Sequence, residues 1–153
     1  MATTGDLPDI IAMLPIFHKI VIEYAVDVKD VEENIGKFSL EVVFGLVGEI
    51  RWSKISYVNC SIVFFRQFRD HIHWGRATET HVMSPEFMME FRDRIDWHIA
   101  SYVQNIPENI ITANYDSVDW EVLSTRDNWS PHFHRKYYFD LYAHKNSYHS
   151  PIW

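Results

Sequence analysis

The sequence of 153 residues contains a single cysteine, Cys60, and few residues that break helices. One thiol excludes an intramolecular disulfide framework and a cysteine-rich zinc site. It also favours a reducing setting, so we expect a cytoplasmic protein. Only five glycines and six prolines occur, which is too few for a turn-rich β sandwich, whereas helix-compatible residues are common. The composition therefore predicts an all-α fold.

The chain also lacks long apolar stretches and clusters of basic residues. No apolar run reaches the roughly 18 residues that a membrane-spanning helix needs. The 21 acidic residues outnumber the 14 lysines and arginines, for a formal net charge of −7, whereas a nucleic-acid-binding surface needs clustered cations. We therefore expect no membrane contact and no direct binding of nucleic acid. Hydrophobic residues make up 47% of the chain and aromatic residues 16%, which excludes disorder and predicts a packed core.

A short pattern of an apolar residue, a polar residue and a tryptophan recurs along the chain. It occurs at Ile50-Arg51-Trp52, Ile72-His73-Trp74, Ile95-Asp96-Trp97 and Val118-Asp119-Trp120. The four tryptophans follow one another at intervals of 22, 23 and 23 residues. A fixed period in the low twenties is typical of repeat proteins. We therefore predict a small solenoid-like array of stacked short helical hairpins, with about 23 residues in each repeat.

The repeats predict how the chain is organised. We expect one helical-repeat domain over residues 1–153. Residues 9–37 would form a degenerate N-terminal unit, in which an apolar helix up to residue 26 precedes an exposed, charged connection over residues 29–37. Four repeats would occupy residues 38–128. Residues 129–153 would form a C-terminal capping unit and tail, because the last unit of an array exposes one face to water.

The clearest repeat runs from Met83 to Asn105. Ser84 is a good N-cap residue, and Pro85 at the first helical position loses no needed hydrogen bond. Asp96 can cap a second helix that begins at Trp97. Each repeat therefore predicts a helix of about 10 residues and a second of about 7, joined by a short turn and stabilised by neighbouring repeats.

The segments from Arg92 to Gln104 and from Asp116 to Ser124 share an Asp-Trp core and a short helix that contains serine. This pattern resembles a family of short tandem repeats found in proteins of large DNA viruses and bacteriophages. The resemblance extends over roughly residues 38–127, although Arg51 and His73 replace the aspartate in the two earlier repeats. It implies a helical array and a viral origin. It implies no active site, because a shared fold does not carry a function with it.

The candidates for metal binding lie near the C-terminus. They are His132, His134, His144 and His149, with Asp140 between them. Imidazole and carboxylate groups bind zinc and other divalent metals. However, residues two positions apart, such as His132 and His134, point to different sides of a helix. We therefore expect no metal and no cofactor. The alternative is a metal-dependent enzyme that uses this cluster.

The other reactive side chains also have structural interpretations. Cys60 precedes an apolar run and is expected to be a buried, small hydrophobic residue. His71 and His73 are expected at a turn between two helices. The carboxylate pairs Asp93 with Asp96 and Asp116 with Asp119 suit helix capping better than acid–base chemistry. No catalytic residue is expected, and the protein is predicted not to be an enzyme.

The best candidate for a binding surface is acidic. Its residues are Glu108, Asp116, Asp119, Glu121 and Asp127, and only Arg126 opposes them. Such a patch attracts basic protein surfaces and speeds their encounter. The sequence therefore predicts a non-catalytic protein-binding module, a viral or phage inhibitor or adaptor that engages a host protein in the host cytoplasm. A nucleic-acid-binding host protein is one such partner. A self-assembling structural protein is the second alternative.

Overall fold

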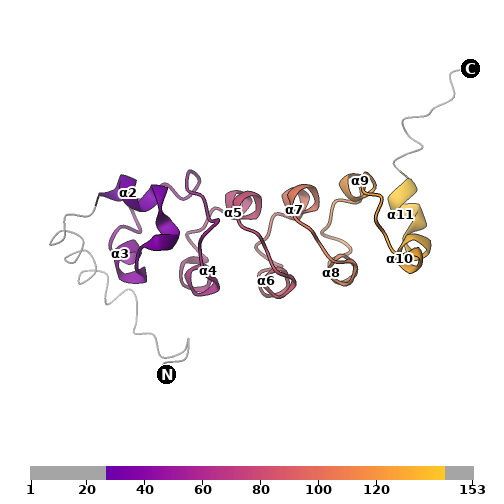
Figure 1. Cartoon of the computed structure of the whole chain (residues 1–153), viewed down its shortest axis with the longest axis horizontal. Helices are drawn as coiled ribbons and strands as arrows, with labels where there is room; N and C mark the ends of the chain where they lie inside the picture. Colours follow the sequence, from indigo (N-terminus) through magenta and orange to yellow (C-terminus); the bar gives the residue numbers. More distant parts are fainter. Residues whose placement is uncertain (1–26, 144–153) are drawn as a thin grey trace, which may run out of the picture. The chain divides into compact units, whose positions relative to one another are not determined.

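The computed structural model describes residues 27–143, and all regular structure in this range is helical (Figure 1). The elements are α2 (Val28–Glu33), η1 (Ile35–Lys37), α3 (Leu40–Gly45), α4 (Ile62–Phe68), α5 (Trp74–Thr80), α6 (Pro85–Glu90), α7 (Trp97–Val103), α8 (Glu108–Ala113), α9 (Trp120–Leu123), α10 (Pro131–Lys136) and α11 (Tyr138–Tyr142). No strand occurs between residues 27 and 143, so the all-α prediction is confirmed there. The helix predicted up to residue 26 lies outside the described residues.

The chain divides into two compact units, the first ending at His81 and the second beginning at Val82. In the second unit, α6 packs against α8, α7 against α9, and α9 against α11. These helices therefore contact the helix two places further along the chain. In the first unit, α2 packs against η1. Between residues 27 and 143, no helix is both long enough and apolar enough to cross a membrane.

Serine residues begin four of the helices. Ser39, Ser61, Ser84 and Ser130 precede α3, α4, α6 and α10, and each side chain accepts a hydrogen bond from the backbone N–H three residues later. These bonds satisfy donors that have no partner within the helix. Pro85 occupies the first position of α6, so the start predicted for this helix is confirmed. In α8, Pro107 stands at the N-cap position and makes no side-chain bond.

The first helix of the clearest repeat is shorter than predicted. It ends at Glu90 after six residues, because Phe91 leaves helical geometry at φ −105° and ψ 21°. The chain then coils through a turn in which the Ile95 amide donates to the Phe91 carbonyl at 3.0 Å. This turn lets the Trp97 indole N–H donate to the carbonyl of Arg92 at 2.8 Å. The same bond recurs from Trp52 to Val47, from Trp74 to Arg69 and from Trp120 to Tyr115.

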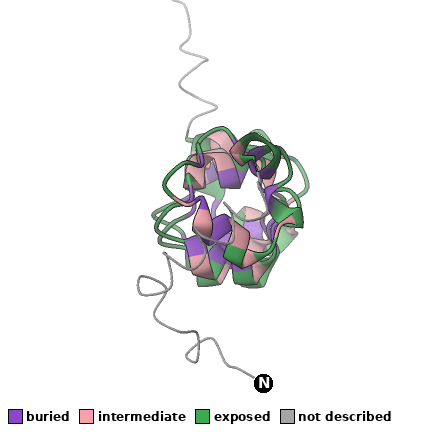
Figure 2. Ribbon diagram, turned by 90° about the vertical axis from the view of Figure 1, so that its left-hand side faces the viewer, coloured by how far each residue is buried: buried purple, intermediate pink, exposed green. Residues whose placement is uncertain are grey.

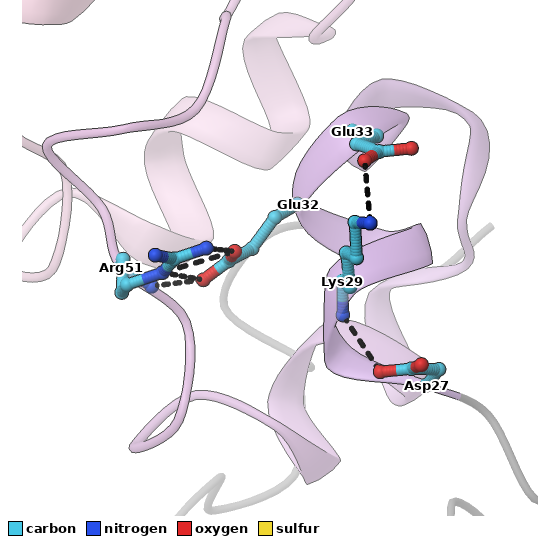
Figure 3. A network of polar contacts seen from close by, with 5 residues as sticks. All are labelled: Asp27, Lys29, Glu32, Glu33 and Arg51. Atoms are coloured by element: carbon cyan, nitrogen blue, oxygen red, sulfur yellow. Dashed lines mark hydrogen bonds and ion pairs between the residues drawn. The ribbon is translucent and has the colours of Figure 1, made fainter.

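The prediction of an exposed connection over residues 29–37 is wrong, because α2 and η1 occupy this segment. Val31 and Ile35 lie four positions apart and are fully buried, so the segment has an apolar face. Lys29 and Glu33 lie on another side of α2 and form an exposed pair at 3.9 Å (Figure 3), whereas Glu32 is buried. Because the segment is highly charged, its two buried apolar positions, Val31 and Ile35, could not be recognised from composition.

The second helix predicted to begin at the first patterned tryptophan, Trp52, is also absent, since turns follow Trp52. The side chains of His73, Asp96 and Asp119 each accept a backbone N–H at the start of α5, α7 and α9. A guanidinium group has no acceptor, so Arg51 cannot cap a helix in this way. Instead, the Arg51 amide and side chain both donate to the Glu32 carboxylate, each with a contact of 2.7 Å (Figure 3).

Aromatic and aliphatic side chains form the core, and the helices carry both buried and exposed residues (Figure 2). In the first unit the core includes Phe44, Tyr57, Phe64, Phe65 and Phe68, and in the second it includes Phe87, Met88, Phe91, Ile111 and Leu123. Trp97 is only 7% exposed and belongs to this core. The equivalent Trp52, Trp74 and Trp120 are half-buried.

Candidate interaction surfaces

Three of the five predicted acidic residues lie exposed in the second unit. Asp116 lies in the turn after α8, Glu121 lies in α9, and Asp127 follows α9. The neighbouring cation, Arg126, is half-buried and donates to the carbonyl of Gln104 at 2.8 Å. Burial lowers the pKa of Arg126. Because this guanidinium contacts backbone carbonyls, it is not directed at the three carboxylates.

Glu108, the fourth acidic residue, connects two helices of the second unit. It begins α8 and is half-buried. Its carboxylate accepts from the Ser130 backbone amide at 2.6 Å and from the Ser130 hydroxyl at 2.7 Å. The same Ser130 hydroxyl caps α10. Glu108 therefore holds the start of α10 beside α8, and both of its carboxylate oxygens accept a hydrogen bond within the protein.

Asp119, the fifth acidic residue, caps α9 and contacts α7. Its carboxylate accepts from the Val122 amide at 3.0 Å and contacts Nδ1 of His98. Its backbone N–H donates to the Ser101 hydroxyl at 3.0 Å. Partial burial opposes ionisation of Asp119, but the hydrogen bonds from Val122 and His98 outweigh it and lower the pKa. The capping interpretation of Asp119 is confirmed.

An open polar hollow of about 360 Å³ lies next to one of the exposed acids. The turn after α6 contributes Arg92 and Asp93, and the end of α8 with its turn contributes Tyr115 and Asp116. Sequence reasoning did not identify this hollow, because its two sides come from turns more than 20 residues apart. Its lining contains one cation, Arg92, and two carboxylates, Asp93 and Asp116. The hollow therefore extends the acidic surface but is not uniformly acidic.

The candidate metal ligands near the C-terminus are not grouped together within residues 27–143. His132 is exposed, and His134 is half-buried and bonds through Nε2 to the hydroxyl of Tyr142. Asp140 accepts a hydrogen bond from the hydroxyl of Tyr115, which raises the pKa of that tyrosine. No three His, Cys, Asp or Glu side chains of the described range are grouped so that they could hold a metal ion. His144 and His149 lie outside the described residues.

The other potentially reactive side chains, of Cys60, His71 and His73, have structural roles. Cys60 is buried, which raises the pKa of its thiol to about 12 and keeps it protonated. His73 caps α5 by accepting from the Arg76 amide at 3.1 Å. His71 stacks on Trp52, with ring centroids 5.7 Å apart. The interpretation of Cys60 as a buried residue is therefore confirmed, and His73 has a capping role beyond the expected turn.

Comparison with known proteins adds no further site. No family model, no curated protein and no solved structure matches this chain. The exposed carboxylates and the side chains around them are therefore the strongest candidate site in residues 27–143.

Proposed function

We propose that this protein is a non-catalytic protein-binding module whose acidic surface engages a basic surface on a partner. We define the acidic surface by its exposed carboxylates, Asp116, Glu121 and Asp127. The observation that carries the proposal is the placement of Arg126, whose guanidinium donates to backbone carbonyls. This nearby cation is therefore directed at backbone carbonyls, and a surface that carries several exposed carboxylates attracts a basic protein.

The finer architecture is also part of this proposal. We propose that the helical hairpins are copies of one unit of about 23 residues, stacked as a small solenoid. Two recurring features support it. The indole N–H of each patterned tryptophan donates to the carbonyl five residues earlier, and helices contact the helix two places further along in the second unit. Stacked repeats present extended surfaces, which suit protein binding.

The biological setting follows from the resemblance to tandem repeats of large DNA viruses and phages. We propose a viral or phage inhibitor or adaptor that acts on a host protein in the host cytoplasm, without cofactor. Host proteins that bind nucleic acid carry basic surfaces that neutralise phosphates. Such a surface is the best match for the acidic one, so occupation of that surface is the proposed mode of inhibition.

A charge-matched pair of variants tests the acidic surface. The test variant carries Asp116→Asn, Glu121→Gln and Asp127→Asn. The control carries Glu33→Gln, Glu41→Gln and Glu49→Gln, three exposed acids of the first unit, and so has the same net charge. Partners are captured from a host-cell lysate at low and high salt and identified by mass spectrometry. Their dissociation constants are then measured by calorimetry.

We expect wild type and control to capture the same basic protein, more strongly at low salt because salt screens exposed charges. The test variant should bind it at least about tenfold more weakly, which corresponds to about 1.4 kcal/mol. Equal binding by test and control variants would show that the partner does not use this surface. A partner whose binding is insensitive to salt would contradict the electrostatic mode.

A further inference from the structure

A second exposed surface, opposite in charge to the acidic one, lies on the last two described helices. We call it the C-terminal aromatic surface and define it by Arg135, Lys136, Tyr138 and Phe139. Phe139 is 83% exposed and Tyr138 is 51% exposed, whereas their neighbours Tyr137 and Leu141 are buried. Isolated exposed apolar residues are common. A phenylalanine and a tyrosine side by side, both turned away from the core, mark a candidate contact site.

One ring of this surface is held in place by its neighbours. The ring of Tyr138 lies 4.8 Å from that of Tyr142 and 6.2 Å from that of His134, measured between centroids. His134 in turn bonds to the hydroxyl of Tyr142. An aromatic ring already fixed by such contacts loses little conformational entropy when a ligand covers it. The surface therefore contains a pre-organised contact as well as a fully exposed ring.

The charge of this surface is positive in a chain whose net charge is negative. Arg135 and Lys136 are exposed in the last turn of α10, and the ammonium of Lys136 lies 5.2 Å from the centroid of the Tyr137 ring. The nearby carboxylate, Asp140, is half-buried and accepts from the Tyr115 hydroxyl. Lys136 precedes Phe139 by three residues, so their Cα atoms are at most about 11 Å apart. An extended segment of four residues is long enough to span the two positions.

We propose that the C-terminal aromatic surface docks an acidic peptide segment of a partner protein. An apolar side chain of that segment covers Phe139, and its carboxylates meet Arg135 and Lys136. Charge complementarity supports this partner. It disfavours a symmetric pair of chains, because the same two cations would then face each other. Nucleic acid is a poorer match, since two cations neutralise too few phosphates to supply the electrostatic term on which such binding depends.

Selection from a random dodecapeptide library on immobilised full-length protein tests this proposal. The most enriched peptide is then labelled, and its dissociation constant is measured by fluorescence anisotropy. The test variants are Phe139→Ser and the pair Arg135→Gln with Lys136→Gln. The matched controls are Tyr102→Ser, which alters another exposed aromatic residue, and the pair Lys29→Gln with Lys37→Gln. Circular dichroism confirms that each variant is folded. The dissociation constant of a labelled oligothymidine for the wild-type protein is measured in parallel.

We expect the enriched peptides to combine an excess of Asp and Glu with at least one large apolar residue. Phe139→Ser should weaken binding at least tenfold, the Arg135/Lys136 pair should remove its salt dependence, and both controls should bind like wild type. The proposal is overturned if no acidic peptide is enriched or if the test variants bind normally. It is also overturned if oligothymidine binds more tightly than the peptide. Light scattering that detects an oligomer lost with Phe139→Ser would assign the surface to a second copy instead. Variants of the acidic surface should leave this binding unchanged, so the two proposals fail separately.

Discussion

At the scale of single residues, the residue before each patterned tryptophan determines how the next segment begins. Asp96 and Asp119 accept a backbone N–H through a carboxylate oxygen, and His73 does so through Nδ1. In each case a helix starts at the tryptophan. The Arg51 side chain can only donate, and turns follow Arg51 instead. The availability of an acceptor atom at this position therefore explains which of the four patterned tryptophans begin a helix.

Trp97→Ala should lower the free energy of unfolding by roughly 3–5 kcal/mol, as truncation of large core residues does. The side chain is 7% exposed and its indole N–H bonds to Arg92, so both packing and a hydrogen bond are lost. Urea denaturation followed by circular dichroism measures the change. Tyr102→Ala is the control and should change stability by less than about 0.5 kcal/mol, because Tyr102 is 70% exposed. Full stability of the Trp97 variant would show that Trp97 is not a core residue.

The Glu32–Arg51 pair should make stability depend on pH. Hydrogen bonds from the Arg51 side chain and amide lower the pKa of Glu32, although burial opposes this. A lowered pKa in the folded state stabilises the protein above the unfolded pKa of about 4.3. This contribution is lost as the pH falls through the folded pKa. The stability difference between wild type and Glu32→Gln should therefore be largest near neutral pH and shrink in acid.

Urea titrations at a series of pH values from neutral to acid measure this difference. Glu33→Gln is the matched control, because Glu33 forms only an exposed pair with Lys29. Exposed pairs contribute about 0–1 kcal/mol, so its effect should be small throughout. If the Glu32→Gln difference stayed constant down to acid pH, the proton linkage assigned to Glu32 would be refuted.

At the scale of helices, a glycine in η1 allows a close backbone contact in the first unit. A Cβ atom placed on Gly36 would lie 2.5 Å from the carbonyl oxygen of Asn59. A backbone atom cannot move aside as the tip of a flexible side chain can. Gly36→Ala should therefore force η1 away from the Asn59 segment and lower the free energy of unfolding by about 1–3 kcal/mol, as overpacking does.

Gly48→Ala, in the turn after α3, is the matched control, because a Cβ atom there would meet nothing within 4 Å. The control should be neutral or slightly stabilising, since alanine restricts the unfolded chain more than glycine does. Thermal unfolding of both variants measures the difference. Equal melting temperatures for the two variants would mean that η1 does not pack on Asn59 as described.

At the scale of the whole molecule, the prediction of one domain over residues 1–153 stays open to test. Single domains of this size usually unfold in one cooperative transition. Urea titrations of the wild-type protein followed by NMR, with amide resonances of Val43 and Phe65 for the first unit and of Met88 and Leu123 for the second, would report on each unit separately. The one-domain prediction requires that their urea transitions coincide. Transitions at clearly different urea concentrations would mean that the units ending at His81 and beginning at Val82 are separate domains.

The two proposed surfaces together suit an adaptor better than a simple inhibitor. The acidic surface would bind a basic partner, and the C-terminal aromatic surface would bind an acidic segment. Both belong to the second unit. A protein with two complementary surfaces can bring two partners together, so the separate sets of variants described above would also assign each partner to its surface.

The helices and their starting residues could be predicted from the sequence in the clearest repeat. Ser84 and Asp96 cap helices where the pattern places them, and Trp97 is buried. These features depend on residues within a few positions of each other, because a cap bonds to an amide three residues away. The helix in residues 28–33 could not be predicted in this way, since its charged residues concealed a narrow apolar face.

The sequence by itself therefore determined the helical class and the helix starts at Pro85 and Trp97, all of which are local properties of the chain. Only the tertiary structure decided which charges are exposed. Glu32 meets Arg51 across 19 residues, and Glu108 meets Ser130 across 22. Such contacts join residues far apart in the sequence and depend on how separate helices pack. A local sequence pattern therefore does not reveal them. The same packing leaves Phe139 outside the core, so both candidate surfaces follow from the fold.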